Sequence, residues 1–294
     1  FRNLEPLTLE PGDGPAVLRA ARENGDVLLS GGRVLSQGWT SRSFERGGRL
    51  WARTMDPLPD GRMVRDLYFR NTRCMRARFP NPLADQTKYT AITRVAGPDR
   101  LEIAMPPPAL GPSSPMGMEI AAIRSWAMPR QLVDTRASSG TEIVCVGALG
   151  ATSGPETVRA GDHVYLENWP AFIDIPYEWT LTRQTPTSRG DLRLLLPDGV
   201  EPAGDIVAPV LERLLILQGC LGITIEGLDF AFTDQPFPMQ GPQRPGYDPG
   251  QAGQDRVRGG SALSGAIELR GATRCIIRRC RVAHTGGNAI MIDG

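Results

Sequence analysis

A chain of 294 residues with 33 basic and 32 acidic side chains has almost no net charge, which excludes the global positive field that attracts nucleic acid. Its hydrophobic content of 40% is that of a folded protein, and no apolar run reaches the roughly eighteen residues of a membrane span. The 34 glycines and 26 prolines indicate a chain organised by tight turns rather than by helices. We therefore expect an all-β protein.

The first 38 residues contain short apolar segments separated by turn residues. Residues 6–9, 16–18 and 27–32 each have the length of a short strand, and Pro11-Gly-Asp-Gly14 supplies a turn. This spacing predicts three short strands that together resemble one coil of a β-helix. At the end of the series, the pair Gly31-Gly32 predicts a turn that requires a positive φ.

Residues 39–204 show a different pattern. Short alternating stretches predict strands of a mainly antiparallel β unit, at residues 50–52, 66–69, 100–103, 141–146 and 163–166. Residues 116–126 fit either a short helix or a strand. We expect the core of this unit to contain four tryptophans, Trp51, Trp126, Trp169 and Trp179.

An internal repeat marks residues 205–294. Leu215-Ile-Leu-Gln-Gly219, Ile223-Thr-Ile225 and Asp229-Phe-Ala-Phe-Thr233 align with Ile267-Glu-Leu-Arg-Gly271, Cys275-Ile-Ile277 and Arg281-Val-Ala-His-Thr285. The offset from Leu215 to Ile267 is 52 residues, and a long loop at 235–260, rich in proline and glycine, accounts for much of it. The next start, Ile290, follows Ile267 after only 23 residues. That spacing is typical of one solenoid repeat.

The repeat predicts which side chains point inward. Two inward columns are expected, Leu215, Ile267 and Ile290 in one, and Leu217, Leu269 and Ile292 in the other. A single coil cannot bury its apolar face alone, so coils must stack. Glu268 and Asp293 alternate with the inward residues and are expected on the solvated outer face. The last strand should expose isoleucines unless more chain follows. We expect the chain to be truncated at both ends.

The ordered set of motifs resembles one known family. It consists of Leu29-Ser-Gly-Gly32, Asp66-Leu-Tyr-Phe-Arg-Asn71, Arg76-Ala-Arg-Phe-Pro-Asn81, Tyr165-Leu-Glu-Asn168, Pro176-Tyr-Glu-Trp179, Val207-Ala-Pro209, Ile225-Glu-Gly-Leu-Asp-Phe230 and His284-Thr-Gly-Gly287. This set resembles the right-handed parallel β-helix glycoside hydrolases of the bacterial α-L-fucosidase and endo-xylanase type. The resemblance covers nearly the whole chain in the family's order.

The resemblance implies an all-β fold in which a right-handed parallel β-helix is interrupted by an inserted, mainly antiparallel β-domain. It implies a first coil at residues 1–38, the insert at 39–204 and resumed, incomplete coils at 205–294. In the family the catalytic acids lie in later coils, so the resemblance implies catalytic residues downstream of Gly294 and an inactive segment. Retaining or inverting hydrolysis requires two carboxylates, and we assign neither to a residue of this chain.

Four residues are candidates for substrate binding. In the family a loop like that around Tyr247 and Gln251 folds over the helix face, where Tyr247 would stack on a sugar ring and Gln251 would bond hydroxyls. His284 aligns with Phe232 of the preceding repeat, and either stacks at the end of its strand or lines the cleft together with Asn288. For Tyr247 and Gln251 the alternative is a surface loop.

Metal, disulfide and cofactor chemistry find little support. The five cysteines are odd in number and irregularly spaced, at Cys74, Cys145, Cys220, Cys275 and Cys280. We expect buried free thiols. With only His163 and His284, a histidine-based metal site would need carboxylates from distant segments. No Walker loop or dinucleotide fingerprint is present, and we expect no metal and no cofactor.

The leading hypothesis is a secreted or periplasmic bacterial glycoside hydrolase that acts on a polysaccharide or oligosaccharide. It has no nucleic-acid partner and no membrane span, and we expect a monomer at full length. Two alternatives stay open. One is a non-catalytic carbohydrate-binding or adhesive β-helix; the other is a polysaccharide lyase or epimerase, for which the single lysine, Lys88, leaves few candidate bases.

Overall fold

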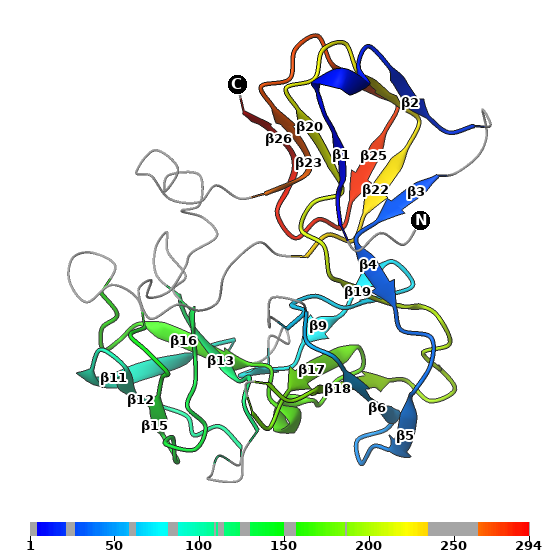
Figure 1. Ribbon diagram of the computed structural model, residues 1–294. Coiled ribbons are helices and arrows are strands. Elements are labelled where there is room, and N and C mark those ends of the chain that lie inside the picture. Colours follow the sequence, from blue (N-terminus) through cyan, green and yellow to red (C-terminus); the bar gives the residue numbers. More distant parts are fainter. Residues whose placement is uncertain are drawn as a thin grey trace.

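The computed structural model describes residues 5–21, 27–58, 63–81, 88–108, 110, 115–123, 130–149, 157–185, 187–234 and 264–293. Over these residues the secondary structure consists of strands and two short 3₁₀ segments, Pro11–Asp13 and Pro170–Phe172. The expected all-β class is confirmed. Figure 1 shows two lobes, one of parallel strands at the top and one of mainly antiparallel strands below.

Three parallel sheets build the first of these, which we call the parallel-sheet lobe. The first sheet has the order β1 (Leu7–Leu9), β20 (Leu215–Gln218), β23 (Gly265–Arg270), β26 (Asn288–Asp293); the second β2 (Val17–Arg19), β21 (Thr224–Glu226), β24 (Ile276–Arg278); the third β3 (Leu28–Ser30), β22 (Asp229–Ala231), β25 (Arg281–Ala283). In every sheet, the strand from the N-terminal segment lies beside the strand from residues 215–231 (Figure 1).

The register of these sheets confirms the predicted repeat. Leu215 pairs with Ile267, which pairs with Ile290, and Leu217, Leu269 and Ile292 form the neighbouring column. Leu7 pairs with Leu215 ahead of them. Ile225 and Phe230 from the other two sheets are fully buried in the same core. At the far strand, Ile292 is 72% exposed, as the sequence predicted.

Left-handed backbone recurs at the corners of both repeats. The corner residues with positive φ occupy aligned positions, Gly219 and Gly271, Gly222 and Arg274, Gly227 and Arg279, and Phe232 and His284. A left-handed conformation costs about 1–2 kcal/mol for a residue with a side chain. The stacked strands therefore dictate the turn geometry even where the second repeat has lost glycine.

Three sheets form the antiparallel lobe. One contains β14 (Arg130–Leu132), β13 (Glu119–Ile123), β16 (His163–Glu167), β11 (Thr90–Gly97), β12 (Arg100–Ile103) and β15 (Glu142–Val144), with β10 (Arg78–Phe79) beside β16; the next β5 (Thr40–Ser43), β6 (Arg49–Met55), β18 (Gly190–Leu196), β17 (Glu178–Thr182) and β9 (Met75–Arg76); the last β4 (Gly32–Val34), β19 (Ile206–Pro209), β7 (Tyr68–Phe69) and β8 (Thr72–Arg73). All these pairs are antiparallel except β9 with β17.

These sheets settle two expectations about residues 39–204. The mainly antiparallel character is confirmed, and the segment that fitted a helix or a strand forms strand β13. Trp169 and Trp179 lie in the cores, Trp51 is partly buried against one of them, and Trp126 lies outside the described residues.

The five cysteines are free thiols. Cys74, Cys145 and Cys220 are buried, whereas Cys275 and Cys280 are half-buried. The limits of the three predicted domains stay predictions.

The lobes join at Gly31 and Gly32. A Cβ atom on Gly31 would lie 2.9 Å from the Phe232 carbonyl oxygen, and one on Gly32 would lie 2.2 Å from a Val207 methyl. Neither glycine has a positive φ, so the expected left-handed turn is wrong. Glycine fits here because a Cβ atom would meet backbone oxygens at Gly31 and the Val207 side chain at Gly32.

Truncation of one inward isoleucine tests the shared core of the parallel sheets. Ile225→Ala removes a fully buried side chain, and we expect it to lower the free energy of unfolding by about 2–5 kcal/mol because it leaves a cavity. Ile276→Ala on the adjacent strand makes the same chemical change at a residue that is 50% exposed, and should cost within about 0.5 kcal/mol. Urea denaturation measures both, and equal losses would contradict the packing.

Candidate functional site

Two glutamates face each other across neighbouring strands of the antiparallel lobe. Glu119 on β13 and Glu167 on β16 are direct register partners, and both are buried. Their strand neighbours Ile120 and Leu166 point to the opposite face, into an apolar core. Like charges directly opposite each other destabilise a sheet. This pair therefore requires compensating cations.

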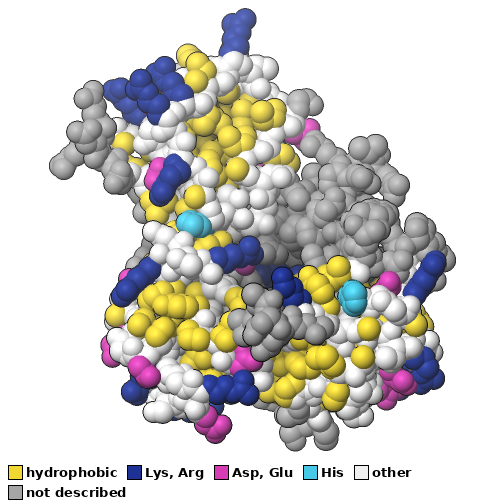
Figure 2. Space-filling model, turned by 180° about the vertical axis from the view of Figure 1, so that it is seen from behind, with side chains coloured by type: hydrophobic (Ala, Val, Ile, Leu, Met, Phe, Trp, Pro, Cys, Tyr) yellow, Lys and Arg dark blue, Asp and Glu magenta, His cyan; other side chains and the backbone are white. Residues whose placement is uncertain are grey.

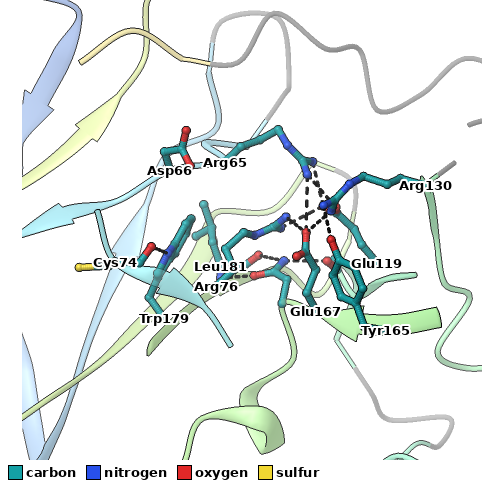
Figure 3. Close-up of polar contacts among 12 residues, drawn as sticks. Arg65, Asp66, Cys74, Arg76, Glu119, Arg130, Tyr165, Glu167, Trp179 and Leu181 are labelled. Atoms are coloured by element: carbon teal, nitrogen blue, oxygen red, sulfur yellow. Dashed lines mark hydrogen bonds and ion pairs between the residues drawn. The ribbon is translucent and has the colours of Figure 1, made fainter. Parts of the chain in front are cut away.

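Three arginines from separate segments supply that compensation (Figure 3). Arg76 on β9 donates to Glu119 at 2.9 Å and to Glu167 at 2.8 Å. Arg65 donates to both oxygens of Glu119, at 3.0 and 2.9 Å. Arg130 on β14 donates to Glu167 at 2.6 Å and to the Tyr165 hydroxyl. We call this group, Arg65, Arg76, Arg130, Glu119, Glu167 and Tyr165, the arginine–glutamate cluster.

The electrostatics of the cluster fix its protonation. Burial disfavours the charged form of Glu119, but Arg65 and Arg76 outweigh burial and hold the pKa of that carboxyl well below its usual range. Burial raises the pKa of Tyr165, so its hydroxyl stays neutral. Bidentate, charge-assisted bonds of this kind fix geometry. The cluster is a structural lock, and Glu119 is unsuited to act as a proton donor.

A second carboxylate pair, at the start of β17, has the opposite character. Glu178 is fully buried and accepts from the backbone N–H groups of Asp174 and Ile175, at 2.9 and 3.2 Å. The Asn81 amide donates to Asp174 at 2.5 Å and to Glu178 at 3.4 Å. Burial and then the Asp174 carboxylate raise the pKa of Glu178 to about 8. This carboxyl holds a proton as an acid catalyst must, yet it has no surface for a substrate to reach.

His284 connects the two lobes. Its ring stacks on Phe232 with centroids 5.0 Å apart, which confirms the predicted alignment of the two positions. The ring of Tyr68, on β7 of the antiparallel lobe, meets His284 edge-on at 5.0 Å. Burial and then Arg281 lower the pKa of His284, so the imidazole is neutral near pH 7. Within the described part of the chain, the ring nitrogens of His284 form no hydrogen bond.

The other three predicted binding residues are Asn288, Tyr247 and Gln251. Asn288 begins β26 and is exposed, and its backbone N–H donates to the Ser264 carbonyl at 3.0 Å. Tyr247 and Gln251 lie outside the described residues, as does the loop that contains them. Contact of any of the four residues with a sugar therefore stays a prediction.

Glu268 corrects one expectation. Alternation placed it on a solvated face, but its side chain is completely buried. Arg213 donates to it at 2.7 Å, Arg270 contacts its other oxygen, and the backbone N–H of Gly265 donates at 3.1 Å. The alternation of the strand predicted the direction of this side chain correctly. It could not predict that Arg213 and Arg270 cover the side chain and bury it. Asp293 is half-buried and lies two positions further along its strand than Met291, the partner of Glu268.

The described ranges hold neither a metal-binding cluster nor a membrane-spanning helix. No group of three or more His, Cys, Asp or Glu side chains in those ranges is placed to hold a metal ion. The described residues also include no helix of the length and apolar character that crossing a membrane requires.

The fold has a counterpart among solved structures. No protein-family model matches the chain, and no curated protein matches it. A solved structure described as "Glycoside hydrolase" is similar, with a TM-score of 0.66 and 17% sequence identity. The match covers 97% of this chain and 53% of that one, so this chain spans about half the length of the structure it matches. At this identity the likeness establishes the fold alone, which is an all-β fold like that of a glycoside hydrolase.

Removal of one charge tests whether the arginine–glutamate cluster stabilises the lobe. Glu119→Gln leaves three largely buried arginines with a single carboxylate, and we expect a loss of about 3–5 kcal/mol in the free energy of unfolding. Glu102→Gln breaks a pair with Arg94 whose side chains are 62% and 35% exposed; it should cost less than about 1 kcal/mol. Chemical denaturation compares the variants. A loss of less than about 1 kcal/mol in the free energy of unfolding for Glu119→Gln would contradict a stabilising role for the cluster.

The Glu178 pair predicts a pH dependence of stability. The pKa of Glu178 is about 8 in the folded state and 4.5 ordinarily. Protonation of Glu178 therefore favours the folded state. This contribution to the free energy of unfolding is complete below pH 4.5 and is lost as the pH rises through about 8. Glu178→Gln keeps a neutral group of the same shape and should flatten this decline. Thermal unfolding between these pH values measures it. Glu201→Gln, at an exposed position, is the control; parallel profiles for Glu178→Gln and wild type would contradict the protonated state.

Proposed function

We propose that this chain is the N-terminal part of a polysaccharide-acting glycoside hydrolase. In this proposal the three parallel sheets are the first coils of a right-handed parallel β-helix, and the antiparallel lobe is an inserted domain. The observation that supports it most strongly is the in-register repeat, in which each sheet receives one strand from every repeat. The likeness in fold to a glycoside hydrolase of nearly twice the length supports the same assignment.

The proposal assigns this chain a wall of the substrate cleft rather than its catalytic acids. Glycoside hydrolysis requires one carboxyl group that donates a proton and a second that acts as nucleophile or base, both in contact with the sugar. Glu119 is held anionic by Arg65 and Arg76. Glu178 is protonated but fully buried. The resemblance to the β-helix glycoside hydrolases implies catalytic carboxylates in coils beyond Gly294, so we expect this segment alone to be inactive.

Substrate binding in this proposal takes place along the β-helix. His284 is partly exposed at the end of β25, and its neutral imidazole can donate and accept a hydrogen bond. Asn288 is exposed at the start of the next strand. These two side chains, with Tyr247 and Gln251, would contact sugar hydroxyls. A substrate of the α-L-fucoside or xylan type, a monomeric full-length enzyme, a bacterial source and a secreted or periplasmic location belong to the same proposal.

A non-catalytic carbohydrate-binding β-helix is the second candidate. The observation that favours it is that the buried carboxylates of the arginine–glutamate cluster and of the Glu178 pair are both unsuited to sugar chemistry. Such a protein would bind oligosaccharides through the same parallel sheets and would hydrolyse none of them.

Activity of two protein lengths distinguishes these candidates. The first is residues 1–294, and the second is the continuous coding sequence that extends past Gly294. We expect hydrolysis of aryl α-L-fucosides or xylan by the longer protein and none by the shorter, because the acids lie in the added coils. Turnover by residues 1–294 alone would contradict the assignment of the acids. Oligosaccharide binding without turnover by the longer protein would favour the binding module.

A further inference from the structure

A polar groove crosses the edge of the five-stranded sheet in the antiparallel lobe. It has a volume of about 310 Å³ and is lined by Thr40, Ser41, Arg42, Leu50, Ala52, Asp191 and Arg193. Strand β5 is the free edge of this sheet, and all four of its residues are exposed. In Figure 1 the β5–β6 hairpin lies at the end of its lobe away from the parallel sheets.

The register places the lining residues other than Ser41 on one face of the sheet. Thr40 pairs with Ala52, and Ala52 pairs with Arg193, so these three side chains form a row across β5, β6 and β18. Arg42 pairs with Leu50, which forms the next row on the same face. Leu50 is buried and Ala52 is half-buried. The groove therefore has an apolar floor at β6 between two polar walls.

The two walls differ in charge. On β18, Arg193 is paired with Asp191, with Nε to Oδ2 at 2.9 Å, so this wall is neutral and offers both donors and acceptors. On β5, Arg42 forms no ion pair with any residue in the described part of the chain. The Thr40 hydroxyl beside it donates to the Ala52 carbonyl at 3.3 Å and keeps its lone pairs for a ligand. Among the described residues that line the groove, the one net positive charge belongs to Arg42.

We propose that this groove is a binding site for a single acidic sugar residue, a hexuronate. Arg42 would bind the carboxylate through charge-assisted bonds. The Asp191–Arg193 pair would bond ring hydroxyls, and the Leu50–Ala52 floor would contact the C–H face of the ring. The volume lies at the small end of the range for ligand pockets, roughly 300–1,000 Å³, which suits one ring rather than an extended chain. The site lies on the antiparallel lobe and is independent of the cleft proposed above.

Figure 2 shows acidic and basic side chains interspersed over one face of the antiparallel lobe, with no single-sign field. In the proposed site, the attraction for an acidic sugar comes from Arg42, because Arg193 is paired with Asp191. A local charge at an exposed site is screened by salt over about 10 Å at 0.1 M. Binding should weaken as the salt concentration rises.

Titration of residues 1–294 with sodium D-glucuronate, followed by amide chemical shifts, tests the proposal. We expect shifts at the groove residues and a millimolar Kd, on the order of what one sugar ring and one charged contact support. D-glucose, which lacks the carboxylate, should bind at least about tenfold more weakly. Arg42→Gln should weaken glucuronate binding by a similar factor. Arg100→Gln, at an exposed arginine on β12, should leave it unchanged.

Several outcomes would overturn the proposal. They are shifts outside the groove, equal binding of glucose and glucuronate, or no loss of affinity in Arg42→Gln while that variant keeps the thermal stability of wild type. Equal binding of sodium acetate would also overturn it, because the groove would then recognise an anion and not a sugar. None of these results depends on glycosidase activity, which is measured separately with the longer protein.

Discussion

The in-register stacking of three parallel sheets is the constraint on which the rest of the structure depends. Strands β1, β2 and β3 have their partners in residues 215–231, so Leu7 lies beside Leu215 although the whole antiparallel lobe separates them in sequence. The entropy cost of closing a loop grows only slowly with its length. A long excursion is therefore tolerated if its two ends meet. They meet where β4 pairs with β19, directly after Gly31, and the glycine pair permits that contact.

The repeat could be predicted from the sequence because its signals are local and recur. The apolar pair Leu215 and Leu217 recurs as Ile267 and Leu269, and turn residues follow both strands at one offset. The observed pairing adds one feature that composition does not show. Arg274, Arg279 and His284 adopt the left-handed conformation that glycine or Phe232 adopts one repeat earlier. Stacking imposes this backbone on residues that disfavour it in isolation.

The arginine–glutamate cluster could not be predicted in the same way. Its five charged members come from segments spread between Arg65 and Glu167, and only the pairing of β13 with β16 brings the two carboxylates together. The local signal was the alternation in Tyr165-Leu-Glu167, which places a charged and an aromatic side chain on the face away from the core. Alternation also predicted the direction of Glu268 correctly, but burial depends on what covers a face, and Arg213 covers this one.

Two buried glutamates of one lobe thus acquire opposite proton affinities from their neighbours. Both lose water on folding, which favours the neutral form. Glu119 receives bidentate bonds from an arginine and stays ionised, whereas Glu178 is buried beside the Asp174 carboxylate and stays protonated. Neither can serve a sugar, since one lacks the proton and the other lacks the exposure. In the proposed function, the sugar binds at the surface of the parallel sheets. There His284 is held in place by Phe232 of its own lobe and by Tyr68 of the other. The antiparallel lobe thereby fixes the orientation of an imidazole on the parallel sheets, which gives the excursion between β3 and β20 a direct role in the geometry of the proposed cleft.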